Sequence, residues 1–127
     1  MFANYDYTEF PEVKVTFDGV INDENDFTLF IDQWRKLYED QQEFTFLFDM
    51  SGMGYVNPKY CYKMSQFISE LKERERQYLT ATRIINVNRY LYYLLLLIFT
   101  IQKPVAPVTI VYNGENVIEP PFSKLHH

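Results

Sequence analysis

The stretch FTFLFDMSGMGYVNP, residues 44–58, decides the fold that the chain is predicted to adopt. Its first part, residues 44–48, offers no polar face, which is typical of a central strand covered on both sides. Its two glycines predict a turn with backbone angles that other residues resist. Asn57 is then a good helix N-cap, and Pro58 suits the first helical position, where no backbone donor is needed. The stretch therefore predicts a strand, a turn and a helix. In open α/β sheets the loop after such a strand is where ligands and partners bind.

Apolar periodicity predicts the elements on either side of this stretch. Strands are expected at residues 13–17, 83–87 and 108–112, with an edge strand near residues 4–8, and helices at residues 23–40, 58–77 and 89–102. The resulting order, βαβαβαβ, predicts an α/β fold: a single-layer mixed, mainly parallel sheet with right-handed crossovers and flanking helices. We expect one domain over residues 1–127, with a core over about 12–113, an edge strand within 1–11 and a tail over 114–127.

The composition limits the class of protein. The chain has 127 residues, of which 47% are apolar, so a core can form without disulfides or metal. A net charge of −5 argues against a nucleic-acid binder. The single cysteine, Cys61, agrees with a reducing compartment, and the start of the chain has no signal-peptide pattern, so a cytoplasmic location is expected. The final His126 and His127 resemble part of an engineered tag, and without them the chain has no histidine.

Nothing in the sequence predicts a cofactor, a metal site or a catalytic centre. The pair Gly52 and Gly54 lacks the third glycine of a dinucleotide loop. Asp49 and Ser51 begin like a metal-binding loop, but Met53 stands at the third ligand position, and hard cations need several oxygen ligands. Cys61 lies on the apolar stripe of a predicted helix, where a core role is favoured over a nucleophile. We therefore expect a protein that is not an enzyme.

The middle of the chain resembles the STAS family, which includes bacterial anti-sigma factor antagonists and the cytoplasmic ends of sulfate transporters. DMSG at residues 49–52 is similar to the family's Asp-Leu-Ser-Gly, and Tyr55-Val56 is similar to the short link that follows. The resemblance implies a non-catalytic domain that binds a protein partner and regulates it. In the antagonists a serine at the following helix start is phosphorylated, but Pro58 stands there in this chain, so the phosphorylation switch is not expected.

Two classes of function follow. The first is a STAS-like protein-interaction domain that docks a partner through the loop. Its expected contact residues are Asp49, Ser51, Gly52, Gly54, Tyr55, Asn57, Pro58 and Tyr60. The alternative is a carrier or sensor of an apolar small molecule or lipid, or a peripheral membrane contact. A large apolar cavity would favour this alternative, whereas a filled core would favour the first.

The helix predicted at residues 89–102 is apolar on every side over residues 90–101. It is too short to cross a membrane, because a spanning helix needs about 20 apolar residues. Either the N-terminal aromatic segment and the C-terminal tail cover it, or it exposes an apolar patch. The patch is expected at Tyr92, Tyr93, Leu96 and Phe99. In that case we expect a homodimer, or a different partner protein, that uses this helix.

Overall fold

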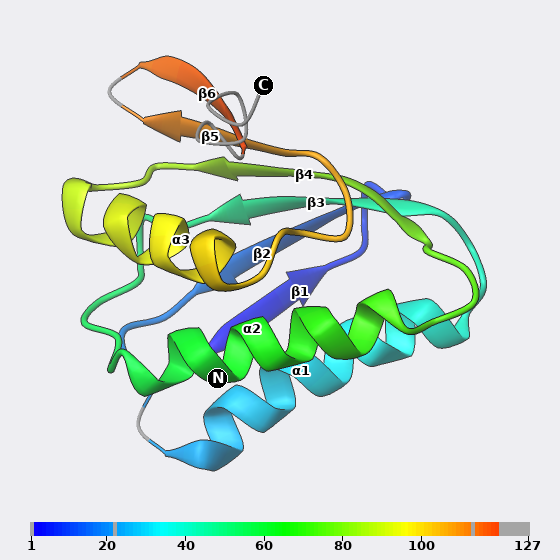
Figure 1. The fold of residues 1–127 in the computed structure, drawn as a ribbon. Helices are drawn as coiled ribbons and strands as arrows, with labels where there is room; N and C mark the ends of the chain where they lie inside the picture. The colour runs from blue at the N-terminus through cyan, green and yellow to red at the C-terminus, as the bar shows by residue number, and fades with distance from the viewer. Residues whose placement is uncertain (1, 22, 113, 120–127) are drawn as a thin grey trace.

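The computed structural model describes residues 2–21, 23–112 and 114–119, and over these residues the chain forms one six-stranded sheet with three helices. The elements are β1 (Ala3–Asp6), β2 (Glu12–Phe17), α1 (Glu24–Glu39), β3 (Phe44–Asp49), α2 (Lys59–Lys72), β4 (Leu79–Ile85), α3 (Arg89–Ile101), β5 (Val108–Tyr112) and β6 (Glu115–Glu119). The strands lie side by side in chain order, β1 to β6 (Figure 1). β2 to β5 are parallel, whereas β1 and β6 pair antiparallel at the two edges. The prediction of a mixed α/β fold is confirmed.

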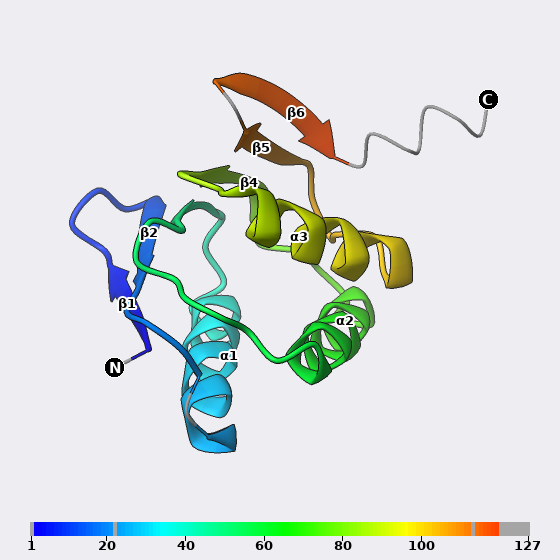
Figure 2. The ribbon, with the colours of Figure 1, turned by 90° about the vertical axis from the view of Figure 1, so that its left-hand side faces the viewer.

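All three helices lie on the same face of the sheet (Figure 2). Each crossover from β2 to β5 moves one strand along in the same direction, so crossovers of the same hand place their helices on the same side. β3 is central, as predicted, and Phe44, Phe46 and Phe48 are buried beneath the helices. The expectation that helices cover this strand on both sides is wrong. Leu47 points to the other face, which we call the outer face, where it is half-buried and pairs with Lys14 and Arg83 of the neighbouring strands.

The centre of the core is aromatic. The ring of Trp34 on α1 lies 4.8 Å from the ring of Phe46 on β3 and 5.1 Å from that of Phe67 on α2, measured between ring centroids. Both contacts are edge-to-face, the arrangement that aromatic pairs prefer. Trp34 therefore joins the two helices to the central strand.

The element boundaries agree with the predictions except between α2 and β4. The predicted helix over 58–77 ends at Lys72, and the strand predicted over 83–87 begins at Leu79. Leu79 is buried and pairs with Phe44 of β3. The register between β3 and β4 then shifts by one residue at Thr80. Pairing with β3 therefore extends the strand into a stretch whose own pattern is weak. At the other end of the chain, β6 adds an edge strand, and residues 120–127 of the predicted tail lie outside the described residues.

Candidate functional site

The loop after β3 begins with a turn that Asp49 organises. Its Oδ1 accepts hydrogen bonds from the backbone N–H of Ser51, at 3.0 Å, and from Nδ2 of Asn86, at 2.9 Å. These two bonds, first that of Asn86, lower the pKa of the Asp49 carboxyl. Asn86 follows β4, so the carboxylate joins the ends of two neighbouring strands. Asp49 thus has a structural role in the turn.

The two glycines of the loop serve close packing of the backbone. The carbonyl of Gly52 accepts from the N–H of Gly19 at 2.8 Å, and the N–H of Gly54 donates to the carbonyl of Gly19 at 2.7 Å. A Cβ atom at Gly52 would lie 2.1 Å from the carbonyl oxygen of Phe17. The expectation of unusual backbone angles here is wrong, because the described glycines with positive φ are Gly19 and Gly114. Gly52 is required by the space available.

Asn57 makes the predicted hydrogen bond at the start of α2. Its Oδ1 accepts from the backbone N–H of Lys59 at 3.0 Å. The helix itself begins at Lys59, one residue later than predicted, although Pro58 already has helical angles (φ −54°, ψ −22°). A one-residue difference of this kind is usual at frayed helix ends.

Replacing Asn57 by alanine should lower the free energy of unfolding by about 1 kcal/mol, because the N–H of Lys59 loses its partner. Urea denaturation followed by circular dichroism measures this loss. Asn57→Ser, which retains an acceptor oxygen, should keep most of the stability. Equal losses in the two variants would contradict the capping role.

The structure divides the predicted partner-binding loop into exposed and buried residues. Exposed are Ser51, Gly52, Tyr55, Asn57 and Pro58, whereas Gly54 is half-buried. Tyr55 is the most exposed large side chain of the loop, at 60%. Tyr60 is buried and packs on the ring of Phe27 at 5.4 Å, so it does not lie on a partner-facing surface.

The loop is fastened to the start of α3. The hydroxyl of Tyr90 donates to the carbonyl of Val56 at 2.8 Å and accepts from the Val56 N–H at 3.2 Å. The ring of Tyr55 stacks on that of Tyr90 with 6.1 Å between centroids. Loop and helix therefore present one continuous surface.

The residues predicted as an apolar patch on α3 do not all share one side. Phe99 is buried, so the prediction that it belongs to an exposed patch is wrong. Tyr92 is half-buried and stacks on Tyr112 of β5 at 4.3 Å, and Leu96 is also half-buried. Of the four residues, Tyr93 is exposed.

The exposed side of α3 instead carries Tyr90, Tyr93, Leu97 and Ile101. The N-terminal segment does not cover it, because β1 lies at the far edge of the sheet from β5, and the tail from residue 120 lies outside the described residues. The sequence pattern could not select this side, since every side of the helix is apolar.

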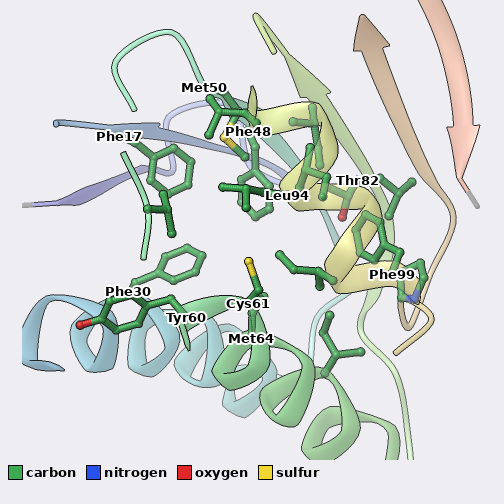
Figure 3. A pocket seen from close by; sticks show the side chains of 18 of the residues that line it. Phe17, Phe30, Phe48, Met50, Tyr60, Cys61, Met64, Thr82, Leu94 and Phe99 are labelled. Atoms are coloured by element: carbon green, nitrogen blue, oxygen red, sulfur yellow. The ribbon is translucent and has the colours of Figure 1, made fainter. Parts of the chain in front are cut away.

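An apolar cavity of about 140 Å³ lies between the sheet and the helices, with lining residues on α1, α2 and α3. Figure 3 shows its walls: Phe48 and Met50 from β3 and the loop, Cys61 and Met64 from α2, and Leu94 and Phe99 from α3. Met64 and Leu94 are half-buried, so the cavity reaches toward the surface between the two helices. Methionine side chains adapt to ligands of different shape. This space is comparable to apolar cavities that stay dry and bind molecules of the size of benzene.

Few polar groups face this cavity. Thr82 of β4 lines it, and its hydroxyl makes no hydrogen bond with the described residues. Trp34 also lines it, and its buried Nε1 has no partner in the described part of the chain. Burial raises the pKa of the Cys61 thiol, which does not suit a nucleophile.

Across residues 2–21, 23–112 and 114–119 there is also no group of three acidic, cysteine or histidine side chains that could hold a metal ion.

Comparison of the chain with protein-family models, with curated proteins and with solved structures finds no significant match. Within the described residues, no helix has the length and apolar character needed to span a membrane.

Proposed function

We propose that this domain is a carrier or sensor that binds a small apolar molecule, or the apolar tail of a larger one, between the sheet and the helices. The observation that carries the proposal is the cavity of about 140 Å³ with apolar walls. Ligand sites are typically apolar spaces with few polar groups that orient the ligand. Here the hydroxyl of Thr82 supplies such a group, so a ligand with one acceptor oxygen suits the cavity better than a charged one.

Benzene is a suitable first probe, because cavities of this volume hold it. Benzene should raise the melting temperature, and the rise should grow with the logarithm of its concentration above the dissociation constant. It should also quench or shift the fluorescence of Trp34, the one tryptophan of the chain. Cys61→Phe places a ring in the cavity and should abolish both effects. Tyr62→Phe, an exposed neighbour on the same helix, is the control and should change neither.

The natural ligand is sought by organic extraction of protein purified from its own cells. Mass spectrometry should find one apolar compound with the wild-type protein and none with Cys61→Phe. If benzene has no effect and no compound distinguishes the two proteins, the proposed function is wrong. If Cys61→Phe does not fold, Leu94→Phe blocks the same space from α3.

A second candidate function is the binding of a protein partner at the exposed loop, on a STAS-like scaffold without a phosphorylation switch. The observation that favours it is the 60% exposure of Tyr55 beside the exposed Ser51, Asn57 and Pro58. A purified partner that binds the wild-type domain but not Tyr55→Ala, with the benzene effect unchanged, would support this function. Neither function requires a catalytic group.

A further inference from the structure

One side of α3 is apolar and exposed. Tyr90, Tyr93, Leu97 and Ile101 are exposed to 42, 56, 36 and 43%, respectively. Their spacing of three and four residues places them on one side of the helix, which we call the α3 outer side. Single exposed apolar residues are common, but a continuous stripe of four is typical of a surface that binds another protein or a membrane.

The sequence segment that contains this stripe carries charges of one sign. From residue 76 to residue 114 the sequence contains four basic residues and no acidic one, although the whole chain has a net charge of −5. Two of the four, Arg89 and Lys103, lie at opposite ends of α3, and both are exposed. Arg89 lies in the first turn of the helix, where a positive charge interacts unfavourably with the helix dipole. Its guanidinium lies 6.0 Å from the ring centre of Tyr93. The contact with the Tyr93 ring offsets part of this unfavourable interaction and holds the positive charge beside the exposed stripe.

This charge pattern argues against a second copy of the chain as the occupant. A two-fold axis that packs two α3 helices antiparallel brings Arg89 of one copy toward Lys103 of the other. A parallel arrangement brings Arg89 toward Arg89. Both arrangements oppose like charges, and the segment 76–114 has no carboxylate to pair with them.

We propose that the α3 outer side docks on the surface of an anionic lipid bilayer. Tyrosine and basic side chains are suited to the headgroup region, where the ring enters the apolar boundary and the charge meets phosphate. At about 1.5 Å per residue, the 13 residues of α3 extend about 20 Å, which is shorter than the hydrocarbon core and fits a helix lying in the plane of the interface. This proposal goes beyond the ligand of the cavity and does not depend on it.

Co-sedimentation with vesicles tests the proposal, using phosphatidylcholine alone and phosphatidylcholine with about a third phosphatidylserine. The wild-type protein should bind the anionic vesicles, and the binding should weaken as salt screens the charges. Leu97→Glu should reduce the partition coefficient roughly tenfold or more, because it removes apolar burial and adds a like charge to the anionic surface. Leu29→Glu is a matched control: Leu29 on α1 is exposed to the same 36%, and its substitution should leave binding unchanged.

Three outcomes would overturn the proposal. The first is no binding to anionic vesicles at low ionic strength, and the second is equal effects of Leu97→Glu and Leu29→Glu. The third is a wild-type dimer in sedimentation analysis that Leu97→Glu dissociates, which would make a second copy the occupant. Circular dichroism checks that both variants fold, and Ile101→Glu replaces Leu97→Glu if that variant does not. Benzene binding by these variants should remain, so failure of this proposal is distinct from failure of the cavity's function.

Discussion

Trp34→Ala should lower the free energy of unfolding by about 3–5 kcal/mol, the cost of removing a large aromatic side chain from a packed core. The indole joins α1 to Phe46 of the central strand and to Phe67 of α2, so its loss removes contacts among three elements at once. Urea denaturation followed by circular dichroism measures the change, since the variant has no tryptophan fluorescence. A loss below about 1 kcal/mol would contradict the central position of Trp34 in the core.

Trp34→Phe is the informative companion. It keeps an aromatic ring and removes an Nε1–H that has no hydrogen-bond partner among the described residues. A buried donor without a partner costs about 1–3 kcal/mol. The phenylalanine variant should therefore lose much less stability than the alanine variant. An equal loss in the two variants would contradict the expectation that an aromatic ring at residue 34 preserves most of the core contacts.

Gly52→Ala should destabilise the protein by about 3 kcal/mol or more, at the upper end of the effects of overpacking. Its Cβ would lie 2.1 Å from the carbonyl oxygen of Phe17, a backbone atom of β2, so either the strand or the loop must move. Thermal and urea denaturation measure the loss.

Gly54→Ala is the matched control for this substitution. A Cβ at Gly54 would lie 3.0 Å from Cγ1 of Val20, a side chain at an exposed position that can shift by a few tenths of an ångström. We expect a clearly smaller loss of stability there. Similar losses at both glycines would contradict the contact with the Phe17 carbonyl as the cause of the effect.

The parts of the fold that local sequence determines were predicted well. α1 was expected over 23–40 and extends over Glu24–Glu39, because Asp23 caps it and accepts a hydrogen bond from the N–H of Asp26. β5 was predicted at residues 108–112 and is found there. In both cases periodicity and end signals agree within one short segment.

The parts that long-range contacts determine were predicted poorly. Leu47 made β3 look covered on both faces, whereas all helices of the described residues lie on the other side and leave its outer face without one. The close approach of Gly52 to Phe17 joins residues far apart in the chain, so the spacing of glycines could not reveal it. The cavity has walls from the sheet, the loop and all three helices, and its existence depends on how their side chains fill the space between them.

The positions of β1 and β6 have a consequence for joining this domain to other chains. Six strands spaced about 4.8 Å apart place these two edges about 24 Å from each other. Domains fused before β1 and after β6 would therefore be attached at opposite edges, with this domain as a rigid spacer between them. A circularly permuted chain would need a linker of at least about seven extended residues. Such a linker can cross the sheet on the outer face, because the described helices all lie on the opposite face (Figure 2).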